Sequence, residues 1–266
     1  MPTQDSRAGR VAEGRAVSDD TAMLSVRGLT KSYRLGDAEV QVLRGIDLTV
    51  AGGEIVAVMG PSGIGKTTLL NCISAIDTPD AGEVLVGQMP VDFSSENART
   101  LLRRDRVGVV FQFFNLVPTL TARENVALPF LIAKADPDSF APRVTRMLAS
   151  VGLEARADHY PRQLSGGEMQ LVSVARALVH SPNVLLADEP TGNVNPAVGR
   201  RIMGILRRAA RDARTATVLV THSPEHAAWA DRVCFLKDGV IAGEHLQEGR
   251  EHDVAPLHER LIELGI

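Results

Sequence analysis

Residues 54–68 read EIVAVMGPSGIGKTT, a stretch that predicts a strand, a turn and the start of a helix. The continuous apolar run at 55–59 is typical of a strand that is buried on both faces. A turn with three glycines follows, and the apolar residues of KTTLLNCISAI at 66–76 recur at helical spacing. Strand, glycine-rich turn and helix in this order form a phosphate-binding loop, because glycines let backbone N–H groups surround phosphate oxygens and the helix presents its positive end.

The turn also fits a specific nucleotide-binding pattern. Residues 60–67 match G-x-x-x-x-G-K-[ST]. In this pattern Lys66 reaches the β- and γ-phosphates, and the hydroxyl of Thr67 binds Mg²⁺. The nucleotide-binding residues predicted here are Gly60, Pro61, Ser62, Gly63, Ile64, Gly65, Lys66, Thr67 and Thr68.

Strand and helix patterns alternate on both sides of this loop. Strands are predicted at 24–33, 40–50, 82–87, 107–112, 183–190 and 216–223, with a hairpin at 232–244 that turns at Lys237-Asp238-Gly239. Helices are predicted at 121–133, 142–153, 166–180, 196–212, 223–230 and 257–265. Because helices replace strands from about 115 to 180, we expect a helical subdomain inserted in an α/β core.

The composition is that of a folded globular protein without a nucleic-acid partner. Apolar residues make up 44% and charged residues 23% of the 266 residues, and the net charge is -3. These values exclude a disordered or fibrous chain and the strong positive field of a nucleic-acid binder. Cys72 and Cys234 lie in apolar surroundings, so we expect two reduced core thiols.

The ends of the chain differ from its centre. Residues 1–22 mix both charge signs with Gly, Ser and Pro, and they lack the apolar segment of a secretory signal. No stretch of the sequence approaches the roughly 18 to 20 apolar residues that cross a bilayer. We therefore expect a cytoplasmic protein with a disordered tail at 1–22, a main domain at 23–246 and a helical C-terminal tail at 247–266.

Two adjacent acidic residues end a later buried strand. The segment NVLLADEP at 183–190 carries Asp188 and Glu189 at the end where a core strand delivers acidic groups to a Mg²⁺-nucleotide. Asp188 suits the metal, and Glu189 suits the attacking water, since a carboxylate that the cation does not neutralise can polarise water. A solvated strand end is the alternative interpretation.

The run LSGGE at 164–168 begins a helical pattern. By itself Ser165 followed by two glycines is a helix N-cap, and the amides of such a helix start form an anion site. With this run the chain resembles the nucleotide-binding subunits of ATP-binding cassette (ABC) transporters, because LSGG separates that family from other P-loop ATPases. The resemblance implies a head-to-tail dimer of two copies, in which the ATP on one P-loop meets Leu164, Ser165, Gly166, Gly167 and Glu168 of the other copy.

The same resemblance implies roles for three further residues. Tyr33 matches the aromatic residue that stacks on adenine, Gln112 matches the glutamine that touches Mg²⁺ and water, and His222 matches the switch histidine that bonds the γ-phosphate. A surface tyrosine, a polar strand end and a capping histidine are the alternatives. The implied cofactors are ATP and Mg²⁺, with Thr67, Gln112 and Asp188 at the metal and Glu189, His222 and Gln112 in catalysis.

The resemblance covers about 24–244 and implies an ABC ATPase domain. Its fold is α/β, with a P-loop NTPase (RecA-like) core, an antiparallel β-subdomain and the inserted helical subdomain. The stretch FQFFNLVPTLTARENV at 111–126 is similar to the lipoprotein-release and macrolide-export branch. That branch implies an integral membrane permease as partner and a peripheral position on the inner face of the cell membrane.

Four positions depart from the family pattern. Asn195 stands where the family usually has Asp, which removes a negative charge and an acceptor at a residue that helps couple the two ATP sites. Met169 stands where Gln is common, Leu171 where Arg is common, and Ile64 where a small residue is common. We expect ATP binding to be retained despite all four substitutions. At Asn195 we expect ATP hydrolysis to be slower or less coupled between the two sites.

Three hypotheses of function follow from these observations. The leading one is the ATP-hydrolysing subunit of an ABC transporter, in which Mg-ATP closes a homodimer that drives a separate permease. A soluble ABC ATPase without a permease is the second, although the sequence has neither the two cassettes of translation factors nor the long coiled coils of repair proteins. The third is an ATP-binding module with little turnover.

Overall fold

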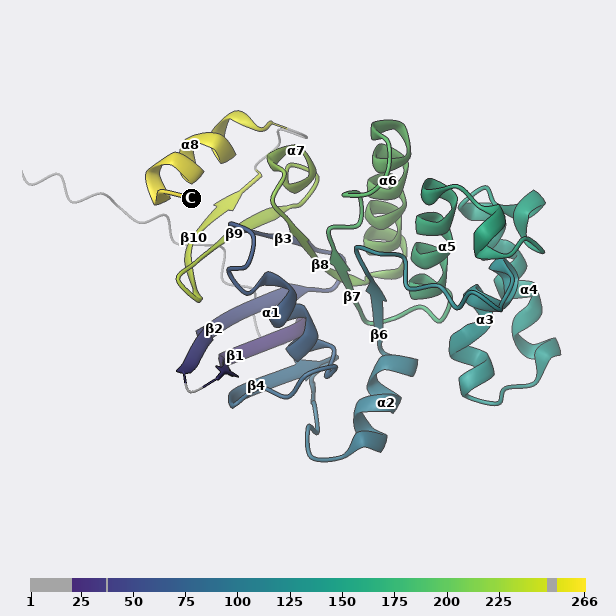
Figure 1. Cartoon of the computed structure of the whole chain (residues 1–266), viewed down its shortest axis with the longest axis horizontal. Helices are drawn as coiled ribbons and strands as arrows, with labels where there is room; N and C mark the ends of the chain where they lie inside the picture. The colour runs from purple at the N-terminus through teal and green to yellow at the C-terminus, as the bar shows by residue number, and fades with distance from the viewer. Residues whose placement is uncertain (1–20, 37, 248–252) are drawn as a thin grey trace, which may run out of the picture.

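The computed structural model describes residues 21–36, 38–247 and 253–266, which form two sheets and a group of helices (Figure 1). One sheet is antiparallel, with strand order β2-β1-β4-β5. Its strands are β1 (Ala22–Leu35), β2 (Ala38–Ala51), β4 (Ala81–Val86) and β5 (Met89–Pro90). This is the antiparallel β-subdomain that the resemblance implied.

The second sheet has six strands in the order β10-β9-β3-β8-β7-β6. Its strands β9, β3, β8, β7 and β6 are parallel, and β10 pairs antiparallel with β9. Because parallel strands align their carboxyl ends, the ends of β3, β7 and β8 lie at one edge of the sheet. The strands are β3 (Ile55–Met59), β6 (Val107–Val110), β7 (Val184–Asp188), β8 (Ala216–Thr221), β9 (Arg232–Lys237) and β10 (Val240–Leu246).

The central strand β3 separates two hydrophobic cores. Val56 and Val58 belong to the core shared with the antiparallel sheet and with helix α1 (Lys66–Ile73). Their neighbours Ile55, Ala57 and Met59 belong to the core shared with the other helices. All five side chains are buried, so the continuous apolar run of the sequence reflects a strand covered on both faces.

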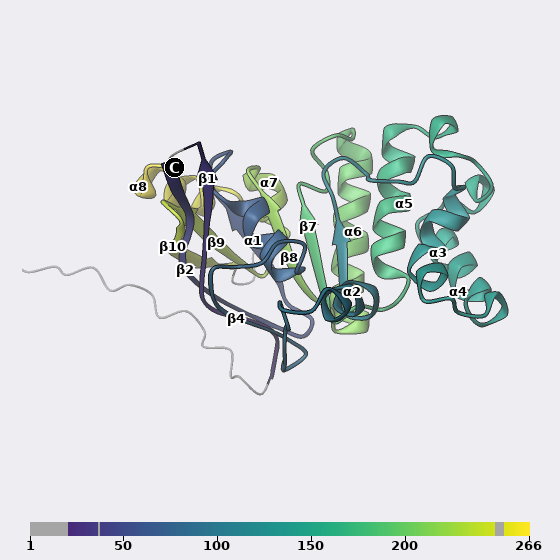
Figure 2. The ribbon, with the colours of Figure 1, turned by 60° about the horizontal axis from the view of Figure 1, so that its bottom comes forward.

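The inserted block consists of α3 (Ala122–Ile132), α4 (Pro137–Ser150) and α5 (Gly166–Leu178), with short 3₁₀ turns at Glu154–Arg156 and Pro161–Gln163. Figures 1 and 2 show these helices on one side of the molecule, with α6 (Pro196–Ala213) between α5 and the six-stranded sheet. Thr121 caps α3 through a reciprocal capping box with Glu124. The rings of Phe130 and Phe140 stack at 5.1 Å between α3 and α4. Each helix therefore begins at its own local signal and is held by apolar contacts.

Helix α2 (Glu96–Asp105) was not predicted, although each predicted strand and helix has a counterpart in the structure. It begins at Ser95, whose hydroxyl accepts from the N–H of Ala98. Its only apolar residues are Ala98, Leu101 and Leu102, and none of its residues is buried, so it lacks the apolar content that marks the other helices. The main sequence signal for a short surface helix of this kind is its N-cap residue, here Ser95.

Regular structure begins and ends close to the expected domain boundaries within the described residues. Residues 1–20 of the predicted tail lie outside the described residues, and β1 already includes Ala22. After α7 (Pro224–Ala227) and the hairpin of β9 and β10, the predicted C-terminal helix occurs as α8 (Ala255–Leu264). Leu257 of α8 is fully buried in the helical core, so this helix packs on the main domain. Within the described ranges, every helix is too short or too polar to cross a bilayer.

Candidate functional site

The glycine-rich loop connects β3 to α1 by a conformation that side chains would block. Gly65 has φ +111°, and a β-carbon there would lie 2.7 Å from Cγ1 of Val42. At Gly60 a β-carbon would lie 2.5 Å from the backbone oxygen of Leu236. Glycine is therefore required at both ends of the loop. At Gly65 both the backbone conformation and the lack of space require it, and at Gly60 the lack of space alone does.

Lys66, the first residue of α1, points back into this loop. Its ammonium donates to the carbonyl oxygens of Gly60 (2.7 Å) and Pro61 (2.9 Å). Burial lowers the pKa of Lys66, and the charges of Glu189 and Asp188 oppose that shift. An ammonium group has three donors, so the two loop carbonyls leave capacity for a phosphate oxygen.

Thr67 and Asp188 meet at the edge of the sheet where β7 ends. The Thr67 hydroxyl donates to Oδ2 of Asp188 over 2.9 Å. Burial and the neighbouring charge of Glu189 raise the pKa of Asp188, while the hydrogen bond from Thr67 acts in the opposite direction. Two oxygen ligands from facing elements, one of them the half-buried carboxylate of Asp188 beside a second acid, are a donor set that fits Mg²⁺.

Glu189 has left-handed backbone geometry, with φ +43°, and its side chain is tied to the end of β8. Its Oε1 accepts from the backbone N–H of His222 (2.9 Å) and lies 2.6 Å from Nδ1 of the same residue. Its Oε2 accepts from the hydroxyl of Thr221 at 3.2 Å. With 8% exposure, the carboxylate has a fixed position beside Asp188. The structure thus brings the predicted water-activating residue and the predicted switch histidine into direct contact.

Gln112 lies on the segment after β6 and contacts the loop that follows Glu189. Its backbone oxygen accepts from the side chain of Asn193 at 2.9 Å. A β-carbon at Gly192 would lie 3.9 Å from its Nε2, which places the side-chain amide beside that loop. Of the three predicted metal residues, the structure therefore joins Thr67 and Asp188 by a hydrogen bond and places Gln112 next to the loop beyond Glu189.

Two residues of α5 that the sequence interpretation did not single out hold this region together. Gln170 is buried, and its Nε2 donates to the backbone oxygens of Phe111 (3.2 Å) and Pro190 (2.8 Å). Arg176 donates to the backbone oxygens of Phe114 (3.0 Å) and Asn115 (2.7 Å). The sequence offered two signals: Gln170 lies between the two unusual positions 169 and 171, and Arg176 interrupts an apolar segment of the helix.

The LSGGE run lies at the start of α5 and makes its contacts with segments other than the P-loop of the same chain. Ser165 is the N-cap of α5 and forms a capping box with Glu168. A β-carbon at Gly167 would lie 3.1 Å from Cγ2 of Val198 in α6. The run contacts the helical subdomain and the segment after β7.

Tyr33 lies at the end of β1, and its side chain is 37% exposed. Its hydroxyl donates to Oδ2 of Asp77 (2.7 Å), whose Oδ1 accepts from the ammonium of Lys31 (2.8 Å). The Lys31 ammonium also lies 5.1 Å from the Tyr33 ring centroid. Burial and the hydrogen bond to Asp77 raise the pKa of Tyr33. The ring is thus an accessible aromatic surface with fixed partners.

The family model described as ABC transporter matches residues 43–192. The chain belongs to the ABC transporter family. It is 44% identical over 217 residues to the lipoprotein-releasing system ATP-binding protein LolD 2 of Caulobacter vibrioides, which covers 82% of this chain and 95% of that protein. It is 41% identical over 238 residues to the macrolide export ATP-binding/permease protein MacB 1 of Aeromonas hydrophila, which covers 90% of this chain and 37% of that protein.

A solved structure of the same family is also similar. The dimeric post-hydrolysis state of the ATP-binding cassette MJ0796 from Methanocaldococcus jannaschii, bound to ADP and Pi, has a TM-score of 0.79 and 38% identity. The match covers 86% of this chain and all of that one. The predicted fold class and the LolD/MacB-like branch are confirmed, and the chain is an ATP-binding and ATP-hydrolysing subunit of the ABC type.

The departures from the ABC pattern have structural explanations. Asn195 is the N-cap of α6, where its Oδ1 accepts from the N–H of Val198 at 3.0 Å. Leu171 is 2% exposed and belongs to the helical core, and Met169 packs against that core. Ile64 packs against the core between the sheets. None of the four substitutions removes one of the hydrogen bonds described above.

Replacing Asn195 with Ala is expected to lower stability by about 0.5 to 2 kcal/mol, because the first turn of α6 loses its capping acceptor. The Asp variant is expected to be at least as stable as the parent, since a carboxylate keeps the cap and is favoured at a helix N-terminus. Thermal unfolding of the three proteins checks this order. An Ala variant that melts with the parent contradicts the capping role.

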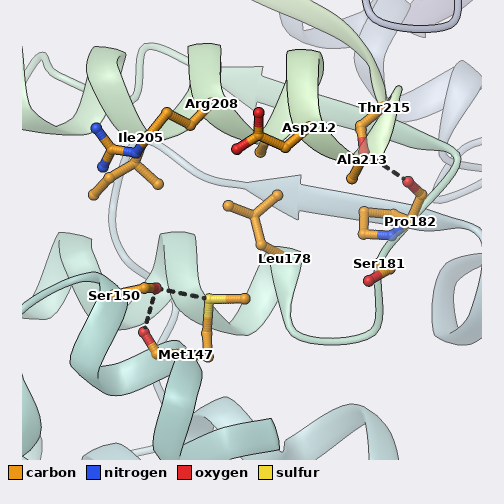
Figure 3. Close-up of a pocket in the computed structure, with 11 residues that line it drawn as sticks. Met147, Ser150, Leu178, Ser181, Pro182, Ile205, Arg208, Asp212, Ala213 and Thr215 are labelled. Atoms are coloured by element: carbon orange, nitrogen blue, oxygen red, sulfur yellow. Dashed lines mark hydrogen bonds between the residues drawn. The ribbon is translucent and has the colours of Figure 1, made fainter.

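A cavity of about 250 Å³ lies between α4, α5 and α6, distant in sequence from the P-loop (Figure 3). Its floor is apolar, with Leu178 and Ile205, and Arg208 and Asp212 of α6 line it as well. None of the predicted ABC site residues lines this cavity. The nucleotide-binding residues gather instead at the carboxyl edge of the six-stranded sheet.

Proposed function

We propose that this ATPase drives a separate integral membrane permease through ATP-dependent closure of a head-to-tail homodimer. The observation that carries the proposal is the joint arrangement at the sheet edge. There the P-loop lysine, the Thr67–Asp188 pair and the Glu189–His222 pair occupy the ends of three neighbouring strands. This arrangement can hold a triphosphate and activate water beside it.

Within this proposal the P-loop and Tyr33 bind ATP. Lys66 and the loop amides neutralise the phosphates, and the exposed Tyr33 ring offers a surface for the adenine. Thr67, Asp188 and Gln112 would hold Mg²⁺, which supplies charge neutralisation at the β- and γ-phosphates when it is bound. The remaining loop residues, Pro61, Ser62, Gly63, Ile64 and Thr68, shape the same cradle.

Glu189 polarises the water that attacks the γ-phosphate. Its carboxylate is fixed by His222 and Thr221, so it needs no reorientation as the reaction begins. His222, whose side chain is 65% exposed, can turn toward a phosphate oxygen when ATP is present. Gln112 connects this centre to the helical subdomain.

The second copy of the chain completes the site. Ser165 is exposed at the helix start, where Gly166 and Gly167 present free amides suited to an anion. Ser165, Gly166 and Gly167 would therefore meet the γ-phosphate held by the other P-loop. Glu168 caps the same helix start, and Leu164, which is 7% exposed, packs in the helical core. The dimer of the similar cassette MJ0796 supports this assembly.

The permease partner would dock beside Gln112 and the helical subdomain. Phe113 is 70% exposed directly after Gln112, and Leu131 and Ile132 are exposed at the end of α3. Exposed apolar side chains of this kind are typical of protein contact sites. The names of the LolD and MacB relatives support lipoprotein release or macrolide export as the class of system, and a peripheral position on the inner membrane face follows.

Capture of the partner tests the proposal. Tagged Glu189→Gln protein is incubated with Mg-ATP and detergent-solubilised membranes of the source cell, and the proteins that co-purify are identified. We expect an integral membrane permease with the tagged protein. Recovery of soluble proteins alone would favour a soluble ABC ATPase. A phosphate-release assay on the parent protein distinguishes the transporter subunit and the soluble ATPase from an ATP-binding module with little turnover.

A further inference from the structure

We propose that Glu168 and Arg156 together set how tightly ATP closes the dimer, by controlling the hydroxyl of Ser165. Glu168 holds the hydroxyl in the open state, and Arg156 neutralises the carboxylate that the incoming phosphate meets. The inference rests on the proposed function, in which Ser165 meets the γ-phosphate on the other copy. It assigns Glu168 and Arg156 as positioning residues.

The hydrogen of the Ser165 hydroxyl is committed within its own helix start. It donates to Oε2 of Glu168 at 2.8 Å and accepts from the backbone N–H of Glu168 at 3.3 Å. The backbone N–H of Ser165 donates to the same Oε2 at 2.8 Å. A serine hydroxyl has one hydrogen, so it can donate to a phosphate oxygen only after leaving Oε2. Dimer closure therefore exchanges one acceptor of this hydrogen for another.

The acceptor that is given up carries a negative charge. The backbone and side-chain hydrogen bonds from Ser165 hold the pKa of Glu168 below its ordinary value, so the carboxylate is ionised at neutral pH. A γ-phosphate that binds Ser165 must therefore approach a like charge. Repulsion between two anions at a partly exposed site weakens closure, and the weakening depends on any nearby cation.

Arg156 is that cation. Its Nε donates to Oε1 of Glu168 at 3.2 Å, which leaves Oε2 to Ser165. Arg156 also contacts the ring of His159 at 3.2 Å, which helps orient the guanidinium. Removing the charge of Glu168 and removing the charge of Arg156 should consequently change closure in opposite directions.

The chain contains a matched control for the local geometry. Glu124 forms the same capping box with Thr121 at the start of α3. Its Oε2 accepts from the N–H of Thr121 at 2.8 Å and from the hydroxyl at 2.9 Å. No role in nucleotide binding is assigned to this box. A Gln at either position keeps the cap, because Glu and Gln both serve in capping boxes.

The experiment measures dimer formation against ATP concentration by light scattering, in the Glu189→Gln background to prevent hydrolysis. Glu168→Gln is expected to lower the half-saturating ATP concentration about two- to tenfold, and Arg156→Gln to raise it by a similar factor, as for partly exposed charge pairs that act at two sites per dimer. Glu124→Gln is expected to leave it unchanged. In the Glu168→Gln protein, the further Arg156→Gln change should have less effect than it has alone.

The experiment distinguishes failure of the proposed function from failure of the inference about Glu168 and Arg156. A Glu189→Gln parent that stays monomeric at saturating Mg-ATP overturns the proposed function and the inference with it. If the parent dimerises and Glu168→Gln behaves like Glu124→Gln, the inference alone is wrong. A purely structural role for Glu168 is distinguished by melting temperature, which we expect to be the same for both Gln variants.

Discussion

Replacing Glu189 with Gln is expected to lower the rate of ATP hydrolysis about 10²- to 10⁴-fold, the usual range for loss of a general base. The amide keeps the shape of the side chain but cannot take a proton from water. Phosphate release at saturating Mg-ATP measures the change. ATP binding should persist, because the P-loop contacts of Lys66 do not involve Glu189.

The fold should tolerate this change for a reason visible in the structure. The amide oxygen can still accept from the backbone N–H of His222. The amide NH₂ would face the hydroxyl of Thr221, which can rotate from donor to acceptor. Glu124→Gln, a change of the same chemistry at a helix cap, serves as the control. Hydrolysis at the parental rate in the Glu189→Gln protein would show that another group activates the water.

Replacing Arg232 with Met is expected to lower the free energy of unfolding by about 1.5 to 3 kcal/mol, the range for hydrogen bonds to charged groups, because the two carboxylates that it leaves unpaired stay partly exposed. Arg232 is 6% exposed. It donates to Glu54 (3.0 Å), to Glu244 (2.9 Å) and to the backbone oxygen of Thr49. Met fills a similar volume but leaves both carboxylates without their cation, next to the buried thiol of Cys234.

Urea unfolding measures this loss. We expect a lower midpoint and an unchanged dependence of the unfolding free energy on urea concentration. The matched control is Arg260→Met, which removes an exposed pair with Glu263 in α8 and is expected to lower stability by at most about 1 kcal/mol. Adding Glu244→Gln to Arg232→Met should recover part of the loss, because one unpaired charge is removed. Equal midpoints for the two Met variants would contradict a stabilising role of the Arg232 network.

The parts of the site that depend on local sequence could be predicted. The P-loop, with its strand and helix, is a continuous pattern, and Asp188 and Glu189 follow a strand whose burial is plain from its composition. The contact between Glu189 and His222 could not be predicted from the residues alone. The two lie 33 positions apart, and they meet because β7 and β8 pair in parallel.

Other features were missed for different physical reasons. Gln170 binds backbone oxygens of two loops that are distant in sequence, so its role depends on tertiary packing. The capping box of Ser165 and Glu168 obeys a local rule, S-x-x-E before a helix, and could have been read from the sequence. Helix α2 has a cap as well, but few of its residues are apolar and none is buried, so no apolar segment marks it in the sequence.

Helix α5 connects the LSGGE run at its start to the segment beside Phe113 near its end. Ser165 begins the helix, and Arg176 lies eleven residues later, a distance of roughly 16 Å along a rod that rises 1.5 Å per residue. Arg176 is fastened to the backbone of Phe114 and Asn115, directly beside the exposed ring of Phe113. A displacement at the Ser165 end can pass along the helix to Arg176. Its two hydrogen bonds would carry that displacement to the segment beside Phe113.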